Sequence, residues 1–189
     1  MDAREALNNW FRRIAGSAEP AKEFEVIAQE AYALDANDFL TQISNAFGLE
    51  ETGRIRGLAD ATCQFILALN EPAPVFYSRL WRQINDNPLF QRESEKLIAL
   101  GAALTIPGMP YKQGNTISMD DEEFVRRVQS LSHDSRDVLG MASRHFSQRT
   151  ESASAVLELI NSHADPRDRA VLGVVLFDAI QAGRVRLFS

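Results

Sequence analysis

The chain has 189 residues, of which 45% are apolar, and a formal net charge of −6. This length can bury one full hydrophobic core, or two small helical subdomains that share an interface. The negative charge argues against a general nucleic-acid or membrane-surface binder, because both targets are anionic. The single cysteine, Cys63, excludes an intramolecular disulfide and any multi-cysteine metal site.

Helix signals recur along the first half of the chain. Asp2 and Asp35 are predicted to cap helices that Gly16 and Gly48 end. Apolar residues at helical spacing follow each cap, and asparagine–proline breaks separate the later helices. We predict six helices before residue 105, over about 2–16, 20–34, 35–48, 54–69, 74–84 and 87–104.

No lysine or arginine occurs from Glu23 to Gly53. The two helices predicted here superficially resemble a helix-turn-helix. However, the second helix has no lysine or arginine that could contact DNA phosphates, and Tyr32 occupies the position where the tight turn favours glycine. A nucleic-acid regulator is therefore only the weakest alternative. It would use arginines that lie beside aromatic residues, namely Arg12, Arg13, Arg79 and Arg82.

The stretch 105–117 contains two prolines and two glycines, which exclude a helix there. It is long for a connector in a helical domain, so it could be a plain surface crossover, a link between subdomains 1–104 and 118–189, or a binding loop. Its side chains suited to binding a partner are Tyr111, Lys112, Gln113 and Asn115.

Four more helices are predicted after this stretch. Ser118 or Asp120 caps the first, with Val125 among its inward residues, Ser132 or Asp134 caps the second, and Thr150 caps the third. The first of these helices opens with the densest acidic run in the chain, Asp120, Asp121, Glu122 and Glu123. Consecutive helical residues point in different directions, so the run suits the helix dipole, or a basic partner, better than a metal ion.

The last predicted helix is the most apolar. Asp165 is its expected N-cap, Pro166 its first residue and Gly183 its stop, and nearly every side chain from Ala170 to Ala182 is apolar. We expect this helix to be buried, with the others packed around it. Asp178 is the exception inside it. We expect it to reach solvent or an arginine partner, and the alternative is a functional carboxylate in a crevice with a perturbed pKa.

Most catalytic and cofactor-binding patterns are absent from the sequence. There is no His-Glu-x-x-His zinc motif, no phosphate-binding glycine loop and no Gly-x-Ser-x-Gly nucleophile motif. We therefore expect no metal and no cofactor.

One short pattern remains. Arg127 and His133, with five residues between them, resemble the Arg-x(4–6)-His signature of HEPN ribonucleases, which are helical bundles. The resemblance implies a metal-independent ribonuclease in which the arginine stabilises the phosphate and the histidine exchanges protons with the RNA 2′-hydroxyl. The match lacks the usual polar residue after Arg127, and a helix break is predicted at 130–132. The ribonuclease is thus the alternative function.

These patterns favour an all-α protein of about ten short helices in a single domain, 1–189, or in the two subdomains 1–104 and 118–189. The leading function is a non-enzymatic protein-interaction module, such as an adaptor, a regulator or an immunity-type protein, with a basic partner. A homo-oligomer is also compatible with the many aromatic residues. Because no signal peptide and no membrane span is recognisable, we expect a bacterial cytoplasmic protein without a membrane contact.

Overall fold

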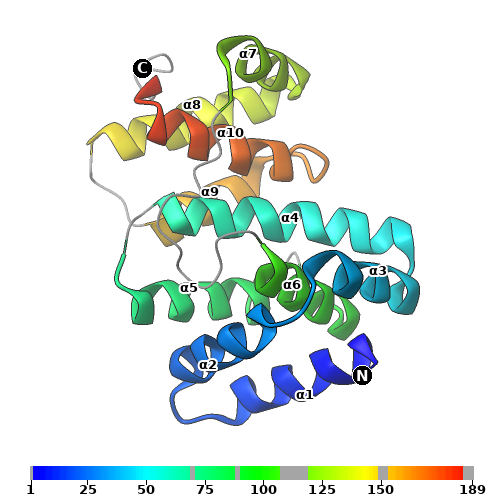
Figure 1. Ribbon diagram of the computed structural model, residues 1–189. Helices are drawn as coiled ribbons and strands as arrows, with labels where there is room; N and C mark the ends of the chain where they lie inside the picture. The colour runs from blue at the N-terminus through cyan, green and yellow to red at the C-terminus, as the bar shows by residue number, and fades with distance from the viewer. Residues whose placement is uncertain (1, 69–70, 88–89, 107–118, 149–152, 185–189) are drawn as a thin grey trace. The chain divides into compact units, whose positions relative to one another are not determined.

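The structure is a computed structural model that describes residues 2–68, 71–87, 90–106, 119–148 and 153–184. These residues form ten α-helices and no strand, which confirms the predicted all-α class (Figure 1). None of the helices in these ranges is long and apolar enough to cross a membrane. The helices are α1 (Ala3–Gly16), α2 (Pro20–Tyr32), α3 (Ala36–Phe47), α4 (Leu49–Ala68), α5 (Ala73–Asn85), α6 (Glu93–Thr105), α7 (Asp121–Ser130), α8 (His133–Gln148), α9 (Ala153–His163) and α10 (Arg169–Gln181).

The chain forms two compact units. Unit 1 consists of Met1–Cys63 and Glu71–Asn115, and unit 2 consists of Gln64–Asn70 and Thr116–Ser189. Helix α4 contributes residues to both units, because the division falls after Cys63 inside this helix. Most of the predicted link 105–117 lies outside the described residues.

Unit 1 is built on the packing of α1, α2, α3, α5 and α6. Its core is rich in aromatic side chains: the Phe24 ring lies 5.5 Å from Tyr77 and 6.5 Å from Trp81, and Phe11 lies 5.1 Å from Trp81. Sequence periodicity predicted the inward face of α5 in full, since all its predicted core residues are buried. They are Phe76, Tyr77, Leu80, Trp81 and Ile84.

Predicted caps fix the helix ends of unit 1. The Asp2 carboxylate accepts a hydrogen bond from the Arg4 backbone N–H at 3.1 Å. The Asp35 carboxylate accepts one from the Asp38 N–H at 2.9 Å. Gly48 ends α3 with a φ of 90°, a conformation that side chains other than glycine rarely adopt. All three roles were predicted from the sequence.

A buried carboxylate holds the start of α6. Glu95 is only 6% exposed and accepts hydrogen bonds from the backbone N–H groups of Gln91 and Arg92 at 3.0 and 3.1 Å. The Arg92 side chain and Arg54 on α4 also donate to it, Arg54 at 2.8 Å. Burial alone raises the pKa of Glu95, but the bonds from Arg92 and Arg54 outweigh burial and lower this pKa to about 2.

Two helix starts differ from the prediction. Helix α4 begins at Leu49 rather than at Arg54, because Glu50 and Glu51 in its first turn favour the helix dipole and Gly53 is tolerated inside it. Helix α6 begins at Glu93 rather than near residue 87, because Glu95 takes up the N–H groups just before the helix.

Gly101 on α6 marks a close approach of helices in unit 1. A Cβ atom at this position would lie 2.6 Å from Ile43 Cδ1 on α3 and 3.2 Å from Leu7 Cδ2 on α1. Both neighbours are buried, at 1% and 0% exposure, so an added Cβ would force their side chains to repack within a close-packed core. Glycine is thus needed here for packing and not for its backbone conformation.

We expect Gly101→Ala to lower the free energy of unfolding by about 1–3 kcal/mol, because overpacking a tight core costs more than alanine gains in helix propensity. Gly53→Ala is the matched control. Gly53 lies inside α4 with no atom within 4 Å of an added Cβ, so this change should stabilise by about 0.5–1 kcal/mol. Urea unfolding of both variants measures the difference, and equal stabilisation would contradict the packing argument.

Helix α10 is buried, as the sequence predicted, but it organises unit 2 rather than the whole chain. Helix α10 packs against α7, α8 and α9, and α8 also packs against α9. Its central side chains are at most 2% exposed, and the Phe65 ring at the end of α4 meets Phe146 of α8 at 5.7 Å. The buried residues of α10 include Leu172, Val175, Leu176, Phe177, Asp178 and Ala179.

The predicted start of α10 was wrong by one turn. The segment from Asp165 to Asp168 forms a hydrogen-bonded turn, and the helix begins at Arg169 rather than at Pro166. The Asp165 carboxylate still accepts a hydrogen bond from the Arg167 N–H at 2.8 Å, and the Asp168 carboxylate accepts one from the Ser132 N–H at 2.7 Å, just before α8. Ser132 in turn caps α8, since its hydroxyl accepts from the Ser135 N–H.

Candidate functional site

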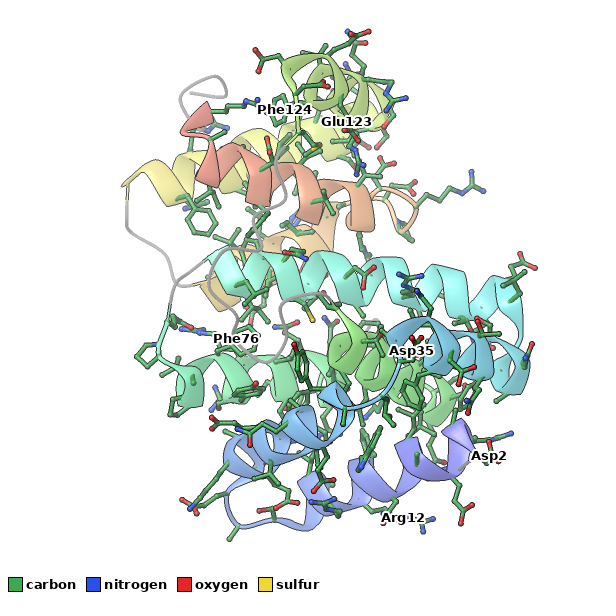
Figure 2. All side chains as sticks on the ribbon, viewed as in Figure 1. Asp2, Arg12, Asp35, Phe76, Glu123 and Phe124 are labelled. Atoms are coloured by element: carbon green, nitrogen blue, oxygen red, sulfur yellow. The ribbon has the colours of Figure 1, made fainter. Side chains whose placement is uncertain are left out.

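The acidic start of α7 is the predicted binding feature that the structure describes. Asp120 is the N-cap, and its carboxylate accepts a hydrogen bond from the Glu123 N–H at 2.7 Å. Asp121, Glu122 and Glu123 occupy the first turn, where the helix dipole favours negative charge. Figure 2 marks Glu123 and Phe124 on this helix.

Arg184, just after α10, anchors the start of α7. Its guanidinium pairs with Asp178, donates to the Met119 carbonyl at 3.1 Å and donates to the Asp121 carboxylate at 2.7 Å. The same group lies over the Phe124 ring, 4.6 Å from the ring centroid. The Arg184 guanidinium thus contacts Met119, Asp121 and Phe124, which lie just before and within the first turns of α7.

Asp178 completes this cluster from inside α10. It is 2% exposed and accepts a hydrogen bond from the Met119 backbone N–H at 2.9 Å, in addition to its pair with Arg184. Of the two outcomes expected for Asp178, solvent or an arginine partner, the structure shows the arginine partner. A buried carboxylate needs such compensation, since an unpaired charge would be strongly disfavoured.

The carboxylates in the first turn of α7 differ in how far ion pairs compensate them and how far they are exposed to solvent. Glu123 pairs with Arg127 at 2.7 Å and lies 4.0 Å from Arg126, so its charge is largely compensated. The Asp121 side chain is 95% exposed, although one of its oxygens meets Arg184. Glu122 is exposed as well. Asp121 and Glu122 are therefore carboxylates of the first turn that a partner can reach, and the capping residue Asp120 is exposed as well.

Two other predictions on this region have definite outcomes. Val125 was expected to face inward but is 49% exposed, because Phe124 occupies the buried side of the helix. The loop residues chosen as binding candidates, Tyr111, Lys112, Gln113 and Asn115, lie outside the described residues.

The structure places the ribonuclease candidates on two helices. Arg127 is in the last turn of α7 and donates through Nε and Nη2 to Glu123 at 3.0 and 2.7 Å. Helix α7 ends at Ser130, and His133 is the first residue of α8. The resemblance to the HEPN signature thus spans a helix break, as the sequence indicated.

Other reactive side chains give little chemistry. Within the described ranges, no group of three or more His, Cys, Asp or Glu side chains is placed to hold a metal ion. Cys63 is buried, and burial raises the pKa of its thiol, with a smaller contribution from Asp60, so the reactive thiolate is disfavoured.

An open depression of about 690 Å³ lies along α1, between Asp2 and Arg12. The residues that line it come from this one helix and its cap, so it resembles an exposed helix face more than an enclosed binding site.

The role of Arg184 was missed in the sequence. The available signal was the ionisable residue Asp178 in an otherwise apolar helix, because a buried carboxylate requires a nearby cation, and Arg184 directly follows the helix stop Gly183.

Comparisons with protein-family models, with curated proteins and with solved structures found no match.

Proposed function

We propose that the protein is a non-enzymatic interaction module that binds a basic partner protein through the acidic start of α7. The observation that carries this proposal is that Asp121 and Glu122 are exposed to solvent at the start of α7. Arg184 and Asp178 hold this helix start in place through their contacts with Met119 and Asp121. An adaptor, a regulator or an immunity-type protein would each fit such an acidic surface.

Electrostatics supports this choice of partner. The net charge of −6 steers basic molecules toward the protein, and exposed carboxylates discriminate against acidic ones. Because hydrogen bonds already hold Met119 and Asp121, the surface loses little conformational entropy when a partner binds.

Catalysis by Arg127 and His133 has weaker support. The Arg127 guanidinium is engaged by Glu123, and the two candidate residues belong to different helices. If the alternative held, His133→Ala would abolish a metal-independent RNA cleavage by the wild-type protein. Our proposal instead expects no RNA cleavage from either protein.

Reversing the charge at Glu122 is expected to weaken binding of the partner by about tenfold, or about 1.4 kcal/mol, because a lysine there repels the partner's basic group. The partner is isolated by crosslinking in cells of the source organism, and its affinity for wild-type protein and for Glu122→Lys is measured by titration at low and high salt. Binding should also weaken with salt.

Glu158→Lys is the matched control, because Glu158 is an exposed glutamate on α9 and the substitution changes the net charge by the same amount. It should bind nearly as the wild type does. Equal losses in both variants would show that only net charge matters, and salt-insensitive binding would contradict an electrostatic partner.

A further inference from the structure

Two buried oxygen atoms on helix α4 lack a hydrogen-bond donor. They are Oδ1 of Asp60 and Oε1 of Gln64, and neither has a partner among the described residues. Gln64 is only 8% exposed. The Asp60 side chain is 36% exposed, but through its other atoms, and its Oδ2 lies 3.6 Å from Nε of Arg56. A buried acceptor without a donor is costly, so this pair of side chains lacks a proton donor.

The spacing of the two residues shows what could supply the missing donor. Asp60 and Gln64 are four residues apart on one helix, so their side chains are neighbours on the same face. An ionised carboxylate and an amide oxygen are both acceptors and cannot bond to each other. A proton on the Asp60 carboxylate converts it into a donor, and the Gln64 Oε1 atom is then an acceptor within its reach.

The environment of Asp60 favours this proton. Burial raises the pKa of Asp60 to about 6, although the Arg56 guanidinium, the charged group that acts on it among the described residues, lowers it. The Cys63 thiol, three residues further along α4, is buried and stays uncharged, because burial raises its own pKa. Asp60 therefore exchanges its proton in mildly acidic solution rather than near the ordinary value of 3.8.

We infer that Asp60 and Gln64 form a pH-sensitive hydrogen bond that stabilises the middle of α4 in mildly acidic solution and is lost at higher pH. The folded helix holds the proton more tightly than an opened one does. Stability against local opening therefore rises as pH falls through about 6 and levels off below 3.8, opposite in direction to the contribution of Glu95. The inference goes beyond the proposed function and needs no partner protein.

Hydrogen exchange of the full chain, followed by mass spectrometry, tests this bond. The measured quantity is the protection of the α4 backbone amides from 60 to 67, corrected for the intrinsic exchange rate, at about pH 7.5 and about pH 5.5. A folded pKa of about 6 and an ordinary value of 3.8 give a rise of about fourfold at the lower pH, and partial exposure of Asp60 reduces it toward about twofold. Asp60→Asn carries a permanent amide donor, so it should raise the protection at pH 7.5 and abolish the rise.

Three further variants separate the hydrogen bond from other effects. Arg56→Gln removes the ion pair but keeps both oxygen atoms, so the rise should persist. In a Gln64→Met background, Asp60→Asn should gain less protection, because its amide then has no acceptor. Asp38→Asn is the matched control on α3: the Gln42 amide N–H already donates to the exposed Asp38 carboxylate at 3.0 Å, so no donor is missing and no gain is expected there.

Three results would overturn the inference. Lower protection of Asp60→Asn at pH 7.5 would show that the Gln64 amide N–H donates to the charged carboxylate. A rise at pH 5.5 that persists in Asp60→Asn would place the titrating group elsewhere. An equal gain in the Gln64→Met background would show that removing the buried charge is sufficient and that Gln64 accepts no bond.

Discussion

Arg184→Met is expected to lower the free energy of unfolding of unit 2 by about 3 kcal/mol, the largest effect anticipated for a single substitution in this protein. The variant leaves the Asp178 carboxylate at 2% exposure without its cation. It also removes the donors to the Met119 carbonyl and to Asp121. Because Arg184 itself is 16% exposed, the loss should fall at the lower end of the range for breaking a buried pair.

Urea unfolding followed by circular dichroism measures this loss. Arg167→Met is the matched control, since Arg167 is an exposed arginine in the turn before α10 and the substitution is the same. It should change stability by less than about 0.5 kcal/mol. Asp178→Asn combined with Arg184→Met should be less harmful than the sum of the two single changes, because the double variant buries no unpaired charge. A loss of under 1 kcal/mol for Arg184→Met, or strict additivity, would contradict the role given to this pair.

Glu95→Gln is expected to destabilise unit 1 by about 2–3 kcal/mol at neutral pH, because the amide loses the charge that Arg92, Arg54 and two backbone N–H groups stabilise. The pKa of Glu95 is lowered to about 2 in the folded protein, below the unfolded value. Its contribution is therefore present above about pH 4.5 and is lost as pH falls toward 2.

The difference in unfolding free energy between wild type and Glu95→Gln should accordingly shrink by about half between pH 7 and pH 3. Glu93→Gln is the control, as Glu93 is exposed in the same first turn of α6. It should have little effect at either pH. A Glu95→Gln difference that is constant with pH would show that the carboxylate charge does not matter.

Local signals made much of the fold predictable. A cap such as Asp35, or a helix stop such as Gly48 or Gly183, acts on backbone groups within a few residues, so the sequence alone reveals it. Most inward faces, such as that of α5, followed from helical periodicity in the same way, because an amphipathic helix buries one stripe; Val125 was an exception.

Contacts distant in sequence were not predictable by these signals. Asp165 followed by Pro166 predicts a helix start, but the helix begins at Arg169, and the contact between Asp168 and the distant Ser132 N–H had no signal in the sequence. Gly101 lacks any turn signal; its need appears only when α1 and α3 approach α6. Both features depend on contacts between segments that are distant in the sequence, a hydrogen bond in the first case and close packing in the second.

The candidate site shows the same division. The acidic run from Asp120 to Glu123 is plain in the sequence, but which carboxylates reach solvent depends on Arg127 within the helix and on Arg184, more than sixty residues away from Asp121. The segment from Glu23 to Gly53 stood out in the sequence only because it has no lysine or arginine. Its exposed apolar side chains, Tyr32 among them, required the structure.

Photo-crosslinking from position 122 tests the proposed function most directly. A photoreactive amino acid replaces Glu122 in one variant and Glu158 in a second, and both are irradiated in cells of the source organism. The account predicts a protein crosslink from position 122, to a basic surface of the partner, and none to the same protein from position 158. Crosslinks to RNA, or the same products from both positions, would contradict a basic protein partner at the start of α7.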